Sequence, residues 1–243
     1  MKSVLVEPSP LDSARFGHAI GRSGLVGAAD VPQLLREAEE LDLEMVIARC
    51  RADDQAGIRS LLDAGSRFMD GELHYRGPLI ELGAQFPSAE VEIRPVQRSE
   101  SGAVELIAGA CFADYGGHYH ADPRLDHEAA GATYVDWAHR CVAGEAADET
   151  LAALLEGEVV GFSAFRLTPD SEVRLVLGAV LPSARGVDLY SRLTLAGANW
   201  AQARGGTEMV CITQVGNLAA QRSWVRVGLR PAAAAYTFHL WRR

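Results

Sequence analysis

The pattern of apolar and polar positions is most regular in the last third of the chain. Residues 173–182 (VRLVLGAVLP) form an apolar, β-branched run that ends at a proline, which predicts a largely buried strand. After a short turn, residues 189–204 carry apolar side chains at helical spacing, and two glycines follow them. A strand followed by an amphipathic helix is therefore expected here.

The positions on either side continue this alternation of elements. Residues 209–214 predict a second buried strand, Asn217 is a suitable N-cap for a helix over 218–227, and residues 232–241 alternate as a final strand. Upstream, residues 151–167 predict a hairpin with a tight glutamate-glycine-glutamate turn. The alternation of strands and helices predicts an α/β layer architecture with a mixed sheet.

A strand, two helices and an unusual loop precede the hairpin. Residues 91–95 predict the strand, and residues 101–110 and 126–141 have helical patterns. The loop between the two helices, residues 112–125 (FADYGGHYHADPRL), combines glycines, aromatic residues and histidines. This composition differs from that of an ordinary connecting segment.

The N-terminal part of the chain contains a weak copy of its C-terminal part. Residues 45–65 (MVIARCRADDQAGIRSLLDAG) align with residues 209–228 (MVCITQVGNLAAQRSWVRVG), with one residue slipped before the closing glycine. Chance similarity between two strand-helix units and a partial duplication remain open alternatives. The duplication hypothesis predicts a truncated half-domain over residues 1–87 and a complete domain over residues 88–243.

Composition and charge narrow the class of protein. Hydrophobic residues make up 48% of the chain and charged residues 23%, as in an ordinary folded protein. The net charge of -9 argues against DNA binding through neutralised phosphates. We find neither a signal-peptide pattern nor an apolar run of about 18 residues, so we expect a cytoplasmic protein that does not enter a membrane. The four cysteines are far apart, which favours reduced thiols over a zinc site.

Two segments carry a resemblance to a known family. AVLPSARGVDLY, residues 179–190, resembles the acyl-coenzyme A loop of the GNAT (GCN5-related N-acetyltransferase) superfamily, and GNLAAQRSWVRVG, residues 216–228, resembles its final helix. Further pieces at residues 11–17, 48–65, 198–205 and 235–242 are similar to the dTDP-fucosamine acetyltransferase branch, which also carries a partial N-terminal half-domain. The resemblance implies a GNAT fold, an α/β arrangement with a mixed central sheet flanked by helices.

The resemblance also implies a reaction and a donor site. An unprotonated amine would attack the acyl thioester directly between two splayed strands, with amides near residues 163–165 facing the acyl oxygen. The donor, acetyl-CoA or another acyl-CoA, would lie along the central strand and end at the loop that follows it. The implied donor residues are Leu177, Gly178, Val180, Arg185, Gly186, Val187, Asp188, Leu189, Tyr190, Asn217 and Trp224.

Two departures from the family pattern leave the donor open. Asp188 occupies a glycine position and adds a negative charge beside the expected pyrophosphate, and Trp224 stands where the family often has a tyrosine acid. In one interpretation Asp188 caps the helix with its side chain and the loop still binds coenzyme A. In a second, the donor is an acyl carrier protein or an aminoacyl-tRNA, as in natural-product biosynthesis. In a third, the chain is a non-catalytic binding module.

The acceptor is expected to be the primary amine of a small polar metabolite, and the resemblance implies an amino sugar or its nucleotide-linked form. The unusual loop would cover its pocket, and two base candidates are His120 and Glu172. Two histidines and a carboxylate also resemble metal ligands, but no further ligand has a regular spacing, so we expect no metal. An exposed sheet edge would permit a homodimer. The candidate acceptor-binding residues are Tyr115, His118, Tyr119, His120, Asp122 and Phe165.

Overall fold

The computed structural model describes residues 4–87, 90–184 and 186–242, and the chain forms two compact units. Unit 1 comprises Met1–Leu73, Gly116–Ala130 and Ala233–Arg243, and unit 2 comprises His74–Tyr115 and Gly131–Ala232. The units are thus interleaved along the chain, because one internal segment and the C-terminus belong with the N-terminal residues. Strands β4 (Arg67–Pro78) and β10 (Arg230–Trp241) contribute residues to both units.

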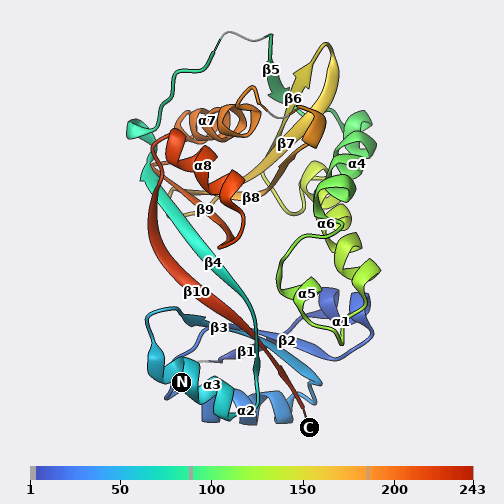
Figure 1. The fold of residues 1–243 in the computed structure, drawn as a ribbon, viewed down its shortest axis with the longest axis vertical. Coiled ribbons are helices and arrows are strands. Elements are labelled where there is room, and N and C mark those ends of the chain that lie inside the picture. The colour runs from blue at the N-terminus through green and yellow to red at the C-terminus, as the bar shows by residue number, and fades with distance from the viewer. Residues whose placement is uncertain (1–3, 88–89, 185, 243) are drawn as a thin grey trace. The chain divides into compact units, whose positions relative to one another are not determined.

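Unit 2 is built around a mixed sheet with the strand order β4-β9-β8-β7-β6-β5 (Figure 1). Neighbouring strands from β5 to β8 are antiparallel, whereas β8 and β9 are parallel. The predicted strand, hairpin and central strands are confirmed. Their bounds are β5 Glu92–Pro95, β6 Glu149–Leu155, β7 Glu158–Leu167, β8 Glu172–Val180 and β9 Glu208–Gln214.

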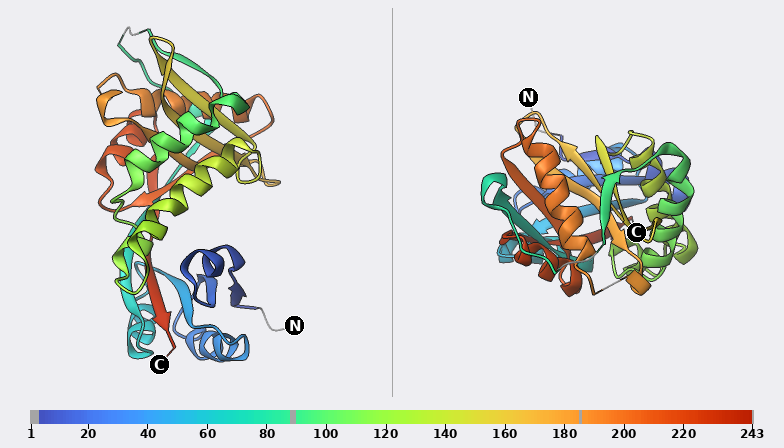
Figure 2. Two further views of the ribbon diagram at one scale, coloured as in Figure 1. Left: turned by 90° about the vertical axis from the view of Figure 1, so that its right-hand side faces the viewer. Right: turned by 90° about the horizontal axis from the view of Figure 1, so that it is seen from above.

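Helices cover both faces of this sheet. Helices α4 (Ser101–Phe112) and α6 (His127–Val142) pack together on one face, where their apolar side chains share a buried core with alternate residues of β7 and β8 (Figure 2). Helix α7 (Leu189–Gln202) covers the opposite face, and α8 (Leu218–Arg226) follows β9. Short 3₁₀ turns at Leu79–Glu81, Arg98–Glu100 and Pro182–Ala184 complete the unit.

The close approach of α7 to the sheet depends on Gly197. A Cβ atom added at this position would lie 2.1 Å from the Phe165 ring, which is fully buried. Because an aromatic ring fixed in a core cannot give way, we expect Gly197→Ala to lower the free energy of unfolding by about 1–3 kcal/mol. Chemical denaturation of the two proteins measures this loss. Gly102→Ala is the matched control in a helix, since nothing lies within 4 Å of its added Cβ; equal stability of all three proteins would contradict the packing argument.

Unit 1 has a smaller sheet, in which β1 (Val6–Pro8), β2 (Ile20–Leu25) and β3 (Met45–Arg51) are followed by β10 and β4. Strand β3 pairs in parallel with β2 and antiparallel with β10. Apolar side chains of α2 (Val31–Glu40) and α3 (Gln55–Asp63) join those of β3 and β10 in one core on one face of the sheet. Helix α1 (Pro10–Phe16) connects β1 to β2.

The two segments that align in the sequence also have similar local structure. In each, a strand leads through an N-cap residue into a short helix: Asp54 accepts from the Gly57 amide at 2.9 Å, and Asn217 accepts from the Ala220 amide at 3.3 Å. Gly65 and Gly228 follow with φ of 90° and 102°, in the left-handed region that favours glycine. The similarity therefore extends to the caps, while the duplication itself stays a hypothesis.

The unusual loop of the sequence is partly helical and is anchored within unit 1. It contains the short helix α5 (His118–Ala121), followed by Asp122, which is 2% exposed. Asp122 Oδ2 accepts hydrogen bonds from His239 Nδ1 and Trp241 Nε1, both at 2.7 Å, and His239 Nε2 lies 3.0 Å from His118 Nδ1. A buried chain of polar groups thus ties this segment to β10.

In the described part of the protein, no helix is both long enough and apolar enough to cross a membrane.

Candidate functional site

The opening between β8 and β9 creates a candidate site in unit 2. The two strands pair from Glu172 opposite Glu208 to Leu175 opposite Cys211. Among the described residues, the pairing of β8 with β9 ends at Leu175 and Cys211, although β8 continues to Val180. Backbone groups of β8 beyond Leu175 therefore have no ladder partner in β9 and are available to a ligand.

A β-bulge coincides with the start of this opening. Ala164 of β7 pairs with Leu177, whereas the next residue, Phe165, pairs with Leu175, so Val176 is an extra residue in β8. A bulge bends its strand and increases the local twist. The bulge accounts for the divergence of β8 from β9 at this point.

The sequence analysis expected the amides near residues 163–165 to face the acyl group, and the strand pairing corrects this expectation. Residues 163–165 pair with β6 on one edge and with β8 on the other. Their N–H groups are therefore inside the sheet rather than at its open edge. The backbone groups that face the opening belong to β8, beyond Leu175.

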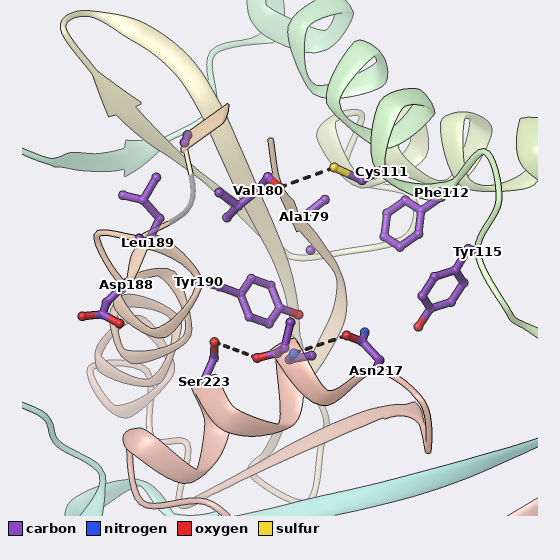
Figure 3. Close-up of a pocket in the computed structure, with 15 residues that line it drawn as sticks. Cys111, Phe112, Tyr115, Ala179, Val180, Asp188, Leu189, Tyr190, Asn217 and Ser223 are labelled. Carbon is purple, nitrogen blue, oxygen red and sulfur yellow. Dashed lines mark hydrogen bonds between the residues drawn. The ribbon is translucent and has the colours of Figure 1, made fainter. Parts of the chain in front are cut away.

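A pocket of about 450 Å³ lies at this opening. Its walls come from the end of β8, the start of α7, helix α8 with its N-cap, and the end of α4 with the turn that follows (Figure 3). The pocket brings together many of the predicted donor residues and adds several that were not predicted. The lining residues are Cys111, Phe112, Tyr115, Gly178, Ala179, Val180, Ala184, Gly186, Asp188, Leu189, Tyr190, Asn217, Ala219, Ala220 and Ser223.

The N-terminus of α7 presents backbone N–H groups at the pocket. Gly186 has a φ of 104° and Asp188 a φ of 57°, so the turn uses two left-handed residues in front of the helix. The first intrahelical bond runs from the Arg192 amide to the Asp188 carbonyl at 2.9 Å, which leaves the amides of the first turn without helical partners. Such a turn and helix start are suited to binding an anion.

The side chain of Asp188 does not cap α7, contrary to one interpretation of the sequence. Its Oδ1 instead accepts a hydrogen bond at 3.0 Å from Arg226 Nη1 of α8, and no cap bond from this side chain is present. The carboxylate is therefore paired with a guanidinium. Since Asp and Asn tolerate left-handed backbone better than other side chains, an aspartate fits this turn.

Two arginines that the sequence analysis did not identify lie beside this turn. Arg192 Nε donates to the Val187 carbonyl at 3.2 Å, and the guanidinium groups of Arg192 and Arg226 lie 4.7 Å and 5.8 Å from the centre of the Phe86 ring. The helical spacing could have indicated Arg192, because this residue stands one turn after Asp188. Nothing in the spacing indicated Arg226, which reaches the turn from another helix.

Tyr190 lines the pocket, whereas Trp224, which was also predicted for donor binding, lies outside the pocket lining. Trp224 is 1% exposed, and its Nε1 has no hydrogen-bond partner within bonding geometry among the described residues. The half-buried Tyr190 ring lies 6.3 Å from the Trp224 ring, tilted by 34°. Burial raises the pKa of the Tyr190 hydroxyl, while the indole of Trp224 acts weakly in the opposite direction.

A polar corner closes the pocket at the end of β9. Tyr115 Oη contacts Gln214 Oε1 and lies 3.3 Å from Thr213 Oγ1, which also accepts a hydrogen bond at 2.9 Å from Asn217 Nδ2. Tyr115 was predicted to bind the acceptor, and Asn217 was predicted to bind the donor. In the structure both residues line the same pocket.

Other predicted residues of unit 2 lie outside the pocket lining. Leu177 is 6% exposed and packs in the core with α4 and α6, and Phe165 lies under α7. Glu172 stands at the paired end of β8, where Arg76 and Arg174 bind its carboxylate at 2.5 Å and 2.7 Å. Val187 contributes its carbonyl to Arg192, and Arg185 lies outside the described residues.

The remaining acceptor candidates belong to unit 1. His118 and Asp122 take part in the buried chain with His239, and burial lowers the pKa of His118 well below its ordinary range. Tyr119 Oη donates to Asp12 Oδ1 at 2.8 Å, and the His120 ring packs edge-on against His127. Within the described ranges, no group of three histidine, cysteine or acidic side chains is placed to hold a metal ion.

Comparison with known proteins shows which family and which proteins the chain resembles. Residues 112–229 match the model of the acetyltransferase (GNAT) family. The chain is 25% identical over 232 residues to dTDP-fucosamine acetyltransferase from Escherichia coli, covering 95% of this chain and 96% of that protein. It is 27% identical over 150 residues to the spore coat polysaccharide biosynthesis protein SpsD from Bacillus subtilis, covering 62% of this chain and 50% of that one.

A solved structure with the same fold is a GCN5-related N-acetyltransferase from Kribbella flavida, with a TM-score of 0.63 and 18% identity over 91% of this chain and 80% of that one. The predicted fold and the predicted transferase class are confirmed. Residues 112–229, which include the bulged strand, the amide turn and every residue of the pocket lining except Cys111, match the acetyltransferase (GNAT) family.

Proposed function

We propose that the protein transfers an acyl group, most simply acetyl, from coenzyme A to the primary amine of a small polar metabolite. The observation that carries this proposal is the pocket at the divergence of β8 and β9, directly beside the amide turn of α7. A thioester arm can bond to the free edge of β8 while its phosphates meet the helix N-terminus. A donor bound in this way would have its carbonyl carbon where an amine can approach it.

The residues around the turn fit a pyrophosphate. An added Cβ at Gly186 would meet nothing within 4 Å, so there is open space in front of the turn. The Asp188 carboxylate is engaged by Arg226, and Arg192 adds a second guanidinium close by. The amides of Leu189 and Tyr190 would bind phosphate oxygens, and the two arginines would supply compensating positive charge.

The proposed reaction needs no covalent enzyme intermediate. The amine attacks the thioester carbonyl, and backbone groups at the open edge of β8 stabilise the charge that develops on the acyl oxygen. Tyr115 and Asn217 border the same pocket and are proposed to contact the acceptor and the donor arm. The assignment of His120 or Glu172 as the base stays a prediction.

An amino sugar, free or nucleotide-linked, is the acceptor class that we favour. Two relatives support this choice by name: one is a dTDP-fucosamine acetyltransferase and the other is a spore coat polysaccharide biosynthesis protein. The first aligns over nearly the full length of both chains, so the similarity includes the parts outside the pocket. The alternative hypothesis, which the aspartate at position 188 suggests, is that the donor is a loaded carrier protein or an aminoacyl-tRNA.

The test combines donor binding with a transfer assay. The purified chain is titrated with coenzyme A by calorimetry and then incubated with acetyl-CoA and a panel of amino sugars, with release of free thiol as the readout. Micromolar binding and thiol release that depends on the amine support the proposal. Absence of binding at millimolar coenzyme A would overturn it and would direct the search to loaded carrier proteins or charged tRNA.

Asp188→Gly is expected to tighten coenzyme A binding by about fivefold to tenfold, equivalent to about 1 kcal/mol. The change removes a negative charge from the pocket wall, releases Arg226 for phosphate, and places glycine at a left-handed position. Calorimetric dissociation constants measure the effect.

Asp188→Asn is the matched control, because it removes the charge but keeps a side chain that tolerates this backbone. Equal gains in both variants assign the effect to charge, and a gain only with glycine assigns it to the approach of the backbone. Unchanged affinity in both would show that Asp188 does not oppose the donor.

A further inference from the structure

The polar corner at the end of β9 stands across the opening from the free edge of β8. Thr213 and Gln214 follow Cys211, the last described residue of β9 that pairs with β8. Because the two strands run in parallel, the corner lies opposite the part of β8 where the proposed donor would bind. A substrate group held at this corner would therefore be close to the acyl carbon.

The N-cap of α8 fixes the direction of the hydrogen bonds in the corner. A backbone N–H can only donate, so the Asn217 side-chain atom that lies 3.3 Å from the Ala220 amide is the oxygen. The Nδ2 group of Asn217 then lies 2.9 Å from Thr213 Oγ1 and donates to it. The Thr213 hydroxyl, which is 5% exposed, therefore accepts from Asn217 and keeps its own proton for another partner.

That partner is the hydroxyl of Tyr115. Its oxygen lies 3.3 Å from Thr213 Oγ1, and it donates its proton to Gln214 Oε1. Since a phenol has no second proton, Thr213 is the donor in the contact between the two hydroxyls. The Tyr115 oxygen thus gives one hydrogen bond and receives one within the corner. Its remaining lone pair is available in the pocket that Tyr115 lines.

Aromatic contacts hold the Tyr115 ring in place. The Phe112 and Tyr134 rings meet it edge-on, with ring centres 5.1 Å and 5.4 Å away. Phe112 and Tyr134 stack on each other at 4.7 Å in the buried core below α4 and α6. In Figure 3 the Tyr115 ring comes from the turn after α4, and its hydroxyl end is directed toward the end of α8 that carries Asn217. A phenol oxygen that is fixed in advance orients a ligand group at a low cost in entropy.

A lone pair at this place selects groups that carry a proton. An amine N–H or a hydroxyl can donate to it, whereas a carboxylate, phosphate or carbonyl oxygen would meet it with a like partial charge. The acceptor of the proposed reaction brings an amine. A hydrogen bond from one N–H of this amine leaves the nitrogen lone pair free to face the acyl carbon.

Resting on the proposed function, we infer that Tyr115 binds and orients the acceptor amine, and that its hydroxyl oxygen accepts a hydrogen bond from the amine nitrogen. Thr213 and Gln214 are positioning residues, because together they determine where the Tyr115 proton points. Asn217 sets this direction from the N-cap of α8. The sequence pattern placed Tyr115 among the acceptor-binding candidates, but it could not show whether the hydroxyl donates or accepts.

The first test compares Tyr115→Phe with the wild-type chain. The KM for the amino sugar that reacts fastest in the panel is expected to rise about fivefold to tenfold, which is the loss of one hydrogen bond, while kcat falls less than about threefold. The dissociation constant of coenzyme A should change by less than about twofold. A merely structural role would weaken coenzyme A binding and lower kcat as well. Tyr134→Phe is the matched control with unchanged KM, because it removes a hydroxyl from a ring that packs against Tyr115 but lies outside the pocket lining.

A second measurement tests the polarity of the corner without turnover. Two analogues of the same sugar, with a hydroxyl group or a fluorine atom in place of the amine, are titrated by calorimetry into the chain saturated with coenzyme A. Fluorine cannot donate a hydrogen bond, so wild type should bind the hydroxyl analogue about tenfold more tightly, and Tyr115→Phe should bind both equally. Gln214→Met removes the acceptor of the Tyr115 proton and frees this proton for the pocket, so the preference should fall below about threefold.

Failure of Tyr115 as the binding residue and failure of the proposed reaction give different results. Equal affinity of wild type for the two analogues, or an unchanged KM in Tyr115→Phe, overturns the role of Tyr115 and leaves acyl transfer standing. A loss of coenzyme A affinity in Tyr115→Phe assigns the hydroxyl to the donor arm and also overturns the role in amine binding. Failure of the wild-type chain to bind coenzyme A or release thiol overturns both.

Discussion

Replacement of Asp122 by alanine is expected to lower the free energy of unfolding of unit 1 by about 3–5 kcal/mol. The carboxylate is 2% exposed and accepts from His239 Nδ1, Trp241 Nε1 and the Arg124 amide. Alanine would leave these buried donors without an acceptor. Urea denaturation followed by far-ultraviolet circular dichroism measures the loss.

Asp122→Asn is the matched control for this prediction. Asparagine keeps the shape and one acceptor oxygen, so it should lose less stability than alanine but more than the wild type. If alanine and asparagine are equally harmless, the hydrogen bonds to His239 and Trp241 contribute nothing to stability, and the prediction fails.

Acid titration gives an independent check of the same group. Burial alone would raise the pKa of Asp122, but the hydrogen bonds from His239 and Trp241 outweigh it and lower the pKa to about 2 from an ordinary value of 3.8. The stability contributed by the ionised carboxylate is therefore present above about pH 4 and is lost as the pH falls toward 2. The difference between wild type and Asp122→Ala should shrink by about 2 kcal/mol over that interval.

The chain around Asp122 also shows why sequence analysis gave this segment a different role. The histidines and the carboxylate of residues 118–122 have the composition of a binding loop, and spacing could not show that β10 supplies their partners. His239 and Trp241 lie far along the chain and meet Asp122 only because β10 pairs with β3 in unit 1. Both ring nitrogens of His239 are engaged in this buried chain, one with Asp122 and the other with His118. The acceptor contacts of this segment remain a prediction.

Local periodicity was sufficient for the elements of unit 2. Strand β8 and helix α7 were predicted close to their observed bounds, because apolar runs, helical spacing and terminal glycines act within a few residues. The bulge at Val176 was not predictable, since it is defined by the register with β7 rather than by β8 alone. For the same reason, the amides that face the opening were predicted in β7 although they belong to β8.

Contacts between side chains of different elements could not be predicted from the sequence either. The aspartate at position 188 suggested a cap or a repulsive charge, and both interpretations treated it within its own turn. The ion pair with Arg226 depends on how α8 packs beside the start of α7. Likewise, the ring of Tyr190 over Gly178 is a contact between a helix and a strand. The sequence therefore located the site, whereas the ion pair and the ring contact required coordinates.

Gly186→Glu is expected to weaken coenzyme A binding by about a hundredfold or more, equivalent to about 2.7 kcal/mol. Gly186 lines the pocket in front of the amide turn, and nothing lies within 4 Å of an added Cβ, so the new side chain has room but brings a negative charge to the phosphate position. Like charges at a few ångströms repel by several kcal/mol at the dielectric of a protein surface. Calorimetric titration measures the loss.

Gly186→Gln separates this charge from the backbone cost, because both side chains have similar size and both would be strained at a φ of 104°. We expect glutamine to weaken binding by less than about tenfold, so the difference between the two variants reports the repulsion alone. Raised salt should narrow that difference, since ions screen exposed charges. If the two variants bind coenzyme A equally well, no phosphate lies at the turn before α7, and the donor enters the opening of β8 from another direction.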